Sequence, residues 1–484
     1  MALAFVSTAH ALDWRFEPSL TASAAYTDNI NQSSSNPQDG MILTAIPGFT
    51  LQSQGSRRVQ ASMQYGLSGV TRFGGNQSDN FYHNLTAVGK AELAKDFLFI
   101  DGSAHVSQQL ISLIGSPADA TTNNSNRATV GTYSISPYIQ RRLGTFANAQ
   151  VRYTASGAIF DNQTAVNANN SSVNAVTAGL ASGTRYNDFT WGLNYSLRKA
   201  DNSHGANTTF ENASARLGYA LTRKFRVFGT VGHDWNDYPS LTATSGDSYS
   251  AGFGWAPSRR TNVEASAGKR YFGNTYSLSA RHRTRMSNWN ASYSEDASDI
   301  TQFLQTSGTR YDYLCLNADG SLDKIVRDWP YSFPPSSNCI AFGGTPGLLF
   351  DLRSGVFIAK TARAGVSWGI RKVTYSLNYS DSRRLYTAAN AEDRTQSLGA
   401  TAIYRMTPRT SLNGSLVLTR THMPAELVGT LHDDDLMTVS LGISHSFAEK
   451  LDGALIFRHT KRDSNVANYS YDENNLMASV NMRF

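Results

Sequence analysis

The sequence has no long apolar run. Across its 484 residues, no stretch approaches the roughly 18 to 20 consecutive apolar residues that a transmembrane helix needs, so a helical membrane protein is excluded. The mean hydropathy of −0.35 resembles that of a soluble protein. A membrane-spanning strand, however, needs only about 9 to 11 residues, and half of them face lipid. The polar average composition is therefore compatible with a β-barrel.

Cysteine is almost missing. The chain holds two, Cys315 and Cys339, in one segment that resembles a loop. In an exported protein two nearby cysteines are expected to form a disulfide. A bridge across about 25 residues would contribute on the order of 3 kcal/mol by reducing the entropy of the unfolded chain. Because no second cysteine pair and no histidine pair lies beside them, the sequence predicts no zinc site.

Catalytic motifs are missing as well. The sequence has no GxSxG, no HExxH and no glycine-rich phosphate loop between a strand and a helix, and its histidines share no metal-binding spacing. We interpret the acidic run from Asp433 to Asp435 as solvated charge in an external loop, with cation binding as the alternative. The sequence thus predicts a protein that is not an enzyme and has no cofactor or metal. A hydrolytic site assembled near one rim is kept only as a third hypothesis.

The strongest positive signal is the C-terminal segment. Residues 475–484 alternate strictly, and a period of two places alternate side chains on opposite faces of a strand. One face is apolar and ends on an aromatic residue, which is typical of the last strand of an outer-membrane barrel. We interpret its main residues as the signal for the barrel-assembly machinery: Leu476, Val480, Met482 and Phe484.

The same alternation recurs along nearly the whole chain. Ten short connections are interspersed with longer stretches rich in Asn, Ser and Asp, such as residues 29–38, 115–126, 161–170 and 381–392. Short periplasmic turns and long external loops are the known asymmetry of outer-membrane barrels. The pattern predicts an all-β fold: a transmembrane antiparallel up-and-down β-barrel of about 22 strands (range about 20 to 24), covering residues 12–484 without a separate plug domain.

The first eleven residues resemble the end of a signal peptide. Ala9-His10-Ala11 fits a small-x-small cleavage site, although the apolar run is short and no basic region precedes it. We interpret residues 1–11 as the remnant of a leader that starts upstream, with an ordinary N-terminal segment as the alternative. The predicted location is the outer membrane of a Gram-negative bacterium.

One connection, about residues 297–353, is far longer than the others. It contains both cysteines, several prolines and a group of aromatic residues, which favours an ordered segment. A barrel of about 22 strands encloses a wide lumen unless something fills it. We therefore predict that this extracellular loop folds into the lumen as a constriction or lid. An external cap is the alternative.

Basic residues dominate the face that should line the lumen. A charge that faces lipid near the midplane costs about 2 to 4 kcal/mol, so mid-strand arginines are expected to point inward. Fewer acidic residues share this face: Glu92, Asp101, Asp234, Glu264 and Asp452. A cationic lumen would favour anionic solutes or acidic polysaccharide; the alternative is that the arginines pair with carboxylates and fill the interior. The lumen-lining arginines are predicted to be Arg152, Arg198, Arg216, Arg226, Arg281, Arg283, Arg363 and Arg458.

Aromatic residues divide between the two faces. Those predicted on the lipid face near strand ends resemble interfacial anchors, and Phe99 and Phe228 are predicted to face inward, too few to form an aromatic track for sugars. The predicted anchors are Phe49, Tyr65, Trp191, Tyr219, Phe225 and Trp368.

Several short motifs resemble a known family. They are found at residues 26–31 (Tyr-Thr-Asp-Asn-Ile-Asn), Asp39, Pro47-Gly48, Gly55 with Arg57-Arg58, and residues 95–101. Together they resemble the outer-membrane β-barrel proteins associated with exosortase (PEP-CTERM) systems, most closely over residues 14–160. The resemblance implies a role beside exopolysaccharide biosynthesis or exported-protein sorting, and the family has no established catalytic residues.

These observations lead to two main hypotheses. The first is a porin-like channel for passage or export of a solute or exopolysaccharide. The second is a non-conducting outer-membrane scaffold or surface-binding protein. The expected partners are outer-membrane lipids and lipopolysaccharide, the barrel-assembly machinery, and exopolysaccharide or its export components. The net charge of +6 is assigned to the lumen and rims and not to nucleic-acid binding.

Overall fold

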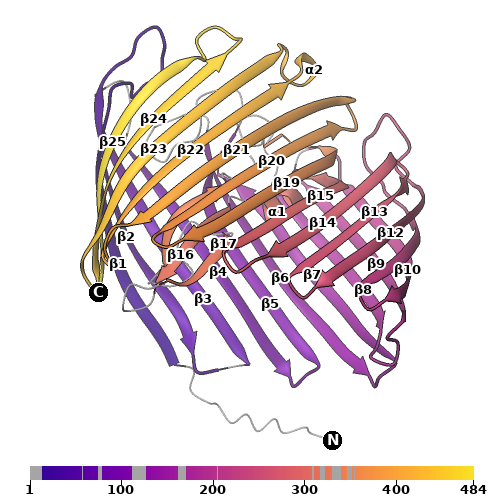
Figure 1. The fold of residues 1–484 in the computed structure, drawn as a ribbon. Helices are drawn as coiled ribbons and strands as arrows, with labels where there is room; N and C mark the ends of the chain where they lie inside the picture. Colours follow the sequence, from indigo (N-terminus) through magenta and orange to yellow (C-terminus); the bar gives the residue numbers. More distant parts are fainter. Residues whose placement is uncertain are drawn as a thin grey trace, which may run out of the picture.

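The computed structural model shows a closed ring of antiparallel strands (Figure 1). The predicted leader remnant, residues 1–11, lies outside the part of the chain that the structure describes. That part comprises residues 13–56, 58–74, 79–111, 127–161, 170–203, 205–307, 310–316, 322–329, 339–345, 352–353 and 355–484.

A single 22-stranded sheet forms the ring, so the predicted strand number is confirmed. The first half contains β1 (Asp13–Thr27), β2 (Gly40–Gln54), β3 (Val59–Phe73), β4 (Asn80–Ala94), β5 (Leu98–Leu110), β6 (Arg127–Leu143), β7 (Ala147–Phe160), β8 (Ser171–Ser182), β9 (Phe189–Asn202), β10 (Thr208–Thr222) and β11 (Phe225–Asp234). The second half contains β12 (Gly246–Ser258), β13 (Thr261–Arg270), β14 (Gly273–Arg283), β15 (Ser287–Asp299), β19 (Val356–Ile370), β20 (Val373–Tyr386), β21 (Ala391–Arg405), β22 (Thr410–Met423), β23 (His432–Ala448), β24 (Leu451–Ser464) and β25 (Tyr471–Arg483).

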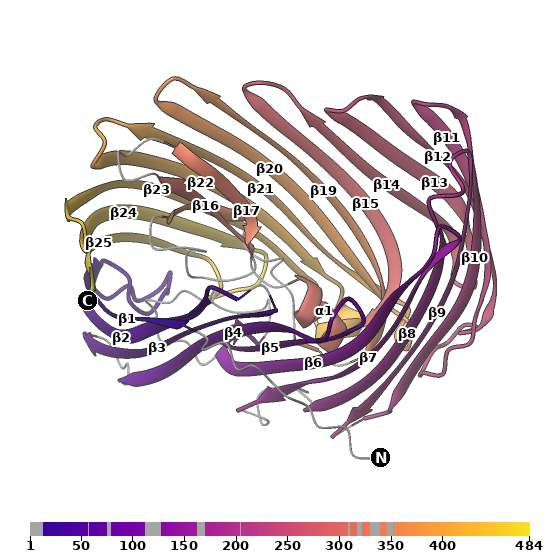
Figure 2. The same cartoon turned by 90° about the horizontal axis from the view of Figure 1, so that it is seen from below.

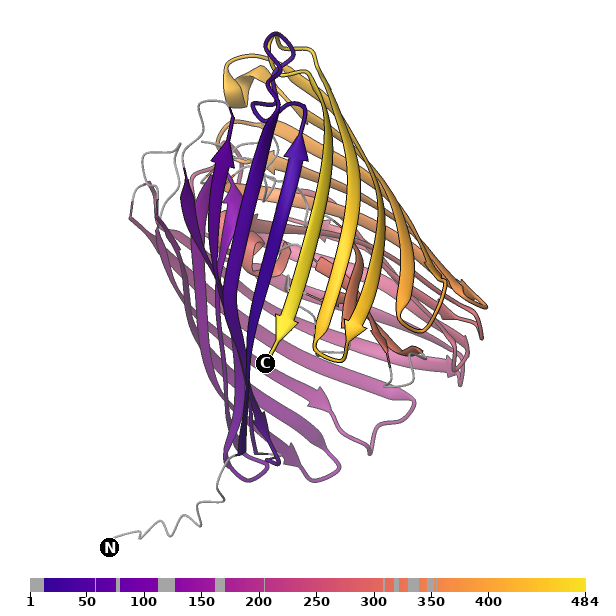
Figure 3. The same cartoon turned by 90° about the vertical axis from the view of Figure 1, so that its left-hand side faces the viewer.

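The last strand closes the ring against the first. β25 pairs antiparallel with β1, from Ser19 opposite Arg483 to Thr27 opposite Asn475, and Figure 3 shows the two strands side by side. Closure satisfies the backbone N–H and C=O groups of both strands, which a bilayer core could not do. The predicted pairing of the C-terminal strand with the N-terminal one is confirmed.

The strands extend further at the external end than the sequence predicted. Residues 381–392 were expected to form a long loop, but β20 continues to Tyr386 and β21 starts at Ala391. The acidic run likewise lies inside β23, where Asp433 pairs with His422 and Asp435 with Arg420. Both expectations were wrong because cross-strand ion pairs allow charged residues to continue a strand beyond the roughly 9 to 11 residues that span lipid. The ten short turns at the other end are confirmed.

The two faces of the ring differ in polarity. Leu217, Tyr219 and Leu221 on β10 are each more than half exposed and point outward, whereas the preceding residue, Arg216, points inward. The register also places every predicted interfacial aromatic on the outward face. Within the described residues no helix has the length and apolar character needed to span a membrane.

The long connection between β15 and β19 contains structure of its own. It begins with α1 (Ile300–Ser307) and includes a separate three-stranded sheet of β16 (Arg310–Leu316), β17 (Leu322–Trp329) and β18 (Cys339–Thr345). Seen from below, α1, β16 and β17 lie inside the ring (Figure 2). A second short helix, α2 (Ala425–Val428), lies between β22 and β23. The backbone register places Cys315 opposite Cys339. Their side chains are outside the described part, so the disulfide stays a prediction.

Candidate functional site

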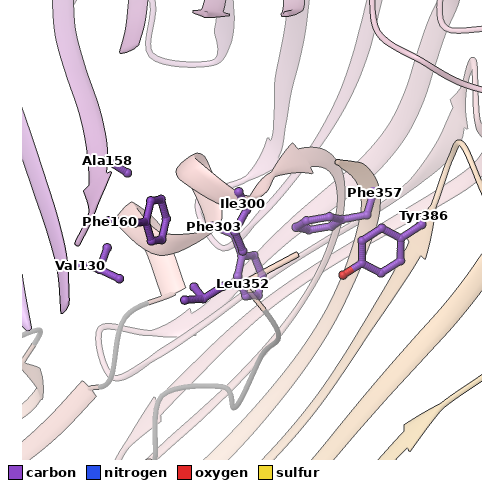
Figure 4. Packing of buried hydrophobic residues seen from close by; sticks show 8 residues of the cluster. All are labelled: Val130, Ala158, Phe160, Ile300, Phe303, Leu352, Phe357 and Tyr386. Carbon is purple, nitrogen blue, oxygen red and sulfur yellow. The ribbon is translucent and has the colours of Figure 1, made fainter. Parts of the chain in front are cut away.

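The candidate site is the helix α1, which touches opposite walls of the lumen. Ile300 and Phe303 of α1 are both buried and belong to one apolar cluster (Figure 4). On one side the cluster contains residues of β6 and β7, and on the other side residues of β19 and β20, which lie across the ring (Figure 2). The cluster members on these four strands all point into the barrel, so the cluster crosses the lumen. Its remaining members are Val130, Ala158, Phe160, Leu352, Phe357 and Tyr386.

Polar contacts fix the first turn of the helix. Asp299 caps α1, since its Oδ1 accepts a hydrogen bond from the Gln302 backbone N–H at 2.9 Å. The same carboxylate accepts two hydrogen bonds from the guanidinium of Arg198 on β9, one of them 3.0 Å long between Nη2 and Oδ1. The hydroxyls of Thr301 in α1 and Ser171 on β8 form a hydrogen bond of 2.7 Å. A cap, an ion pair and a hydroxyl contact thus hold α1 against the β8–β9 wall.

A buried ion pair supports α1 from the other wall. Arg384 on β20 and Asp393 on β21 are almost inaccessible and are joined by two hydrogen bonds, including Nε to Oδ1 at 3.0 Å. The Arg384 guanidinium also lies 5.4 Å from the ring centre of Phe357 and 5.9 Å from that of Phe303. Cation–π contact at a desolvated site contributes about 2 kcal/mol. The ion pair therefore orients the aromatic residues that hold the helix.

Further contacts join separate loops at the end of the barrel opposite the short turns. The Leu352 N–H donates to the Ile111 carbonyl at 3.1 Å. The Leu241 N–H donates to the Thr387 carbonyl at 3.0 Å, and the Thr387 hydroxyl donates to the Pro239 carbonyl at 3.1 Å. The first contact joins the β15–β19 connection to the residue that follows β5, and the other two join the β11–β12 loop to the β20–β21 loop. This end of the barrel is therefore narrowed by hydrogen-bonded backbone.

A polar cavity of about 500 Å³ lies beside α1, between Gln302 and the β9–β13 wall. At its edge Arg270 binds the carboxylates of Asp234 and Asp296 at 2.8 and 2.7 Å. In the adjoining loops, the hydroxyls of Tyr238 and Tyr271 form a 2.9 Å hydrogen bond, and burial raises the pKa of both phenols. Both phenols thus stay neutral well above physiological pH. The paired charges and neutral hydroxyls suit a polar solute with no large net charge.

At least four of the eight predicted lumen arginines form ion pairs inside the barrel. The register places all eight on the inner face, opposite the exposed apolar residues. Arg152 pairs with Asp101 at 2.9 Å and Arg198 with Asp299, while Arg216 and Arg226 share Glu264 at 2.9 and 2.5 Å. Within the described residues, Arg281 and Arg283 are exposed and form no ion pair. The inner face also holds Arg363 and Arg458.

Sequence reasoning missed several contributors. Tyr138 faces inward and stacks on Phe99, with ring centres 5.1 Å apart and the Arg152 guanidinium 3.9 Å from the Tyr138 ring. The outward Ile135 and Ile139 give the alternation that would have revealed it. The helical spacing of residues 300, 303 and 304 was the available signal for α1. No sequence pattern pointed to the Arg384–Asp393 pair.

Within the described residues, no group of three or more His, Cys, Asp or Glu side chains is arranged to hold a metal ion. No protein-family model matches the sequence, and no curated protein matches it.

Solved structures share the barrel fold. The siderophore receptor PirA from Acinetobacter baumannii aligns with a TM-score of 0.51 at 9% identity, over 97% of this chain and 80% of that one. The FrpB iron transporter from Neisseria meningitidis (F5-1 variant) aligns with a TM-score of 0.50 at 10% identity, over 97% of this chain and 81% of that one. At this identity the similarity concerns the fold alone. The chain thus folds as a 22-stranded barrel of the outer-membrane type.

Proposed function

We propose that this protein is an outer-membrane channel whose lumen is held closed by the segment of residues 297–353, with α1 at its centre. A solute or an exported polysaccharide would pass when that segment moves. The observation that carries the proposal is the contact of Ile300 and Phe303 with both walls of the barrel. Apolar contacts on two sides of the helix and polar contacts at one end support a packed segment inside the lumen over an external cap.

The proposal includes the surroundings of the barrel. The apolar outer face would contact outer-membrane lipid, and the charged strand extensions, such as Arg420 with Asp435, would lie at the level of lipopolysaccharide headgroups. The terminal strand would be recognised by the barrel-assembly machinery. A Cys315–Cys339 disulfide would link β16 to β18 within the closing segment, as their register allows. A function beside exopolysaccharide or protein-sorting systems is supported by the sequence resemblance.

A non-conducting scaffold is the second candidate. It is favoured by the bonds that join separate loops at the external mouth, such as Leu352 to Ile111 and Leu241 to Thr387. If α1 never leaves its position, the barrel would serve to present its loops. The two candidates differ in one measurable property, which is ion conductance.

Conductance in planar bilayers tests the proposal. We expect the wild-type barrel to show a small conductance with rare large openings. Replacing residues 300–352 by a short Gly-Ser linker should give a large, permanent conductance, because it removes α1 with Ile300 and Phe303 together with the rest of the closing segment. Shortening the 465–470 connection, which lies at the same end of the barrel, is the control and should leave conductance low. An unchanged low conductance after the 300–352 deletion would reject the channel and support the scaffold.

A further inference from the structure

We propose that the periplasmic half of the lumen contains a binding site for an acidic polysaccharide, formed by Arg226, Arg281 and Arg283. This inference rests on the proposed channel function and specifies the substrate class and the side from which it enters. It follows from how charge is distributed along the inner wall of β10–β15.

The strand register brings the basic side chains together with amides. Arg281 on β14 lies opposite Asn262 on β13 and Asn290 on β15, and Arg283 lies opposite Asn288. All of them face the lumen, because their strand neighbours Tyr276 and Leu278 are exposed on the lipid side. These Arg and Asn side chains on β14 and β15 are themselves exposed, so they are open to a ligand in the lumen.

The charge of this wall is not balanced. Arg216 and Arg226 share a single carboxylate, Glu264, and the Arg226 side chain remains 56% exposed. In the periplasmic half of β10–β15, Glu264 is the one acidic side chain on the inner face among the described residues. With Arg281 and Arg283 added, four guanidinium groups face one carboxylate. A wall with this excess of positive charge attracts anions from solution.

The other half of the lumen behaves differently. Near the extracellular end each of three inner arginines is paired with an aspartate: Arg384 with Asp393, Arg270 with Asp234 and Asp296, and Arg462 with Asp434. The guanidinium groups of those arginines are therefore occupied by structural ion pairs. The periplasmic patch is therefore not a general consequence of an arginine-rich chain, and Arg281 and Arg283, which form no ion pair among the described residues, remain available for binding.

The chemistry of the patch favours a carboxylated sugar polymer. Guanidinium groups bind carboxylates through two parallel hydrogen bonds, and Asn amides both donate to and accept from sugar hydroxyls. Single-stranded nucleic acid would need an exposed aromatic ring on which its bases could stack. Phe228 does not offer one, because the Arg216 guanidinium covers one face of its ring, 3.7 Å from the ring centre. Its other side packs on the wall, since a Cβ at Gly252 would come within 2.5 Å of the Phe228 ring.

The position of Arg283 in the barrel indicates the side from which the polysaccharide would enter. Arg283 is the last residue of β14, next to the short turn at the periplasmic end, while α1 and the bonded loops close the extracellular half. The patch is thus reachable from the periplasm while the lumen is closed. A polymer held there would lie below the closing segment, ready to pass outward when α1 moves, which corresponds to export.

Direct binding tests the site without any measurement of conductance. The wild-type barrel in nanodiscs would be titrated calorimetrically with oligogalacturonate, with neutral dextran oligomers of equal length as comparison. We expect oligogalacturonate to bind with an affinity that falls as salt is raised, and dextran not to bind. The double variant R281Q/R283Q should lose at least tenfold in affinity. The control R285Q/R371Q removes two arginines from periplasmic turns and should bind as the wild type does.

The possible results distinguish a failure of the proposed binding site from a failure of the proposed channel. If R281Q/R283Q binds oligogalacturonate like the wild type while the 300–352 deletion conducts, the site is overturned and the channel stands. If binding is lost in R281Q/R283Q but the deletion does not conduct, the channel fails and the site stands. Binding of polyphosphate without binding of oligogalacturonate would overturn the assignment to a polysaccharide. Heat-modifiable mobility in SDS gels confirms that each variant is a folded barrel.

Discussion

Arg198 on β9 and Asp299 at the start of α1 form a two-point ion pair inside the barrel, with side chains only 14% and 10% exposed. Asp299 is the last residue of β15, so the pair connects two strands, β9 and β15, that the ring order separates. It is the polar counterpart of the apolar cluster around Phe303. Together they explain how a helix of eight residues remains in a lumen made of 22 strands.

Substitution of Arg198 by Gln should open the channel more often. Breaking a largely buried ion pair costs about 3 kcal/mol or more, which corresponds to a factor of roughly 100 in an equilibrium between closed and open states. The open fraction in single-channel recordings measures this shift towards the open state. Asp299→Asn should act in the same direction while keeping the helix cap. Arg223→Gln, in a periplasmic turn, is the matched control. An open fraction equal to that of the wild type in R198Q would contradict the assigned role of the pair.

Phe303→Ala should weaken the closing segment without unfolding the barrel. Truncating a buried Phe costs about 3 to 5 kcal/mol through lost transfer energy and the cavity left behind. The side chain is 4% exposed, and its partners come from both walls. We expect greater entry of a bulky antibiotic such as vancomycin, measured as killing of cells that carry the variant. Phe447→Ala, on the exposed outer face, is the control. Equal sensitivity of the two variants would argue against the packing described here.

The two cysteines should be oxidised in the exported protein. The register of β16 and β18 places Cys315 directly opposite Cys339 in an antiparallel pair, a spacing that a disulfide can bridge. Maleimide labelling of the unfolded protein should be negligible before reduction and should add two labels per chain after it. Cys315→Ser, with one remaining thiol, provides the calibration. Full labelling without a reductant would show that the bridge is not formed.

Removal of Phe484 should impair assembly. Its backbone N–H donates to the Pro18 carbonyl at 2.9 Å, at the seam where β25 meets β1, and its side chain is exposed on the outer face. We expect a several-fold lower fraction of heat-modifiable, folded barrel in outer-membrane preparations. Lys450→Ala, in the neighbouring turn, should assemble normally. Normal assembly of the truncated chain would mean that the terminal aromatic is dispensable.

The sequence by itself determined the barrel. The strict alternation within each strand, as in residues 475–484, predicts which side chains face lipid. The alternation of short turns with long loops predicts the number of strands and the pairing of the last strand with the first. These features are local, since each needs only the period of a strand and the length of a turn. The extent of β20, β21 and β23 was misjudged because cross-strand ion pairs extend strands beyond lipid.

Only the tertiary structure decided what fills the lumen. The sequence placed eight arginines inside but left open whether they are free or paired, and that depends on carboxylates such as Asp299 and Glu264, which lie 101 and 38 positions away from Arg198 and Arg226. The contact of Phe303 with Phe357, in a cluster that also contains Phe160, likewise joins segments that meet only once the ring has closed. Contacts across a lumen have no period along the chain, so they become visible only when both walls are in place.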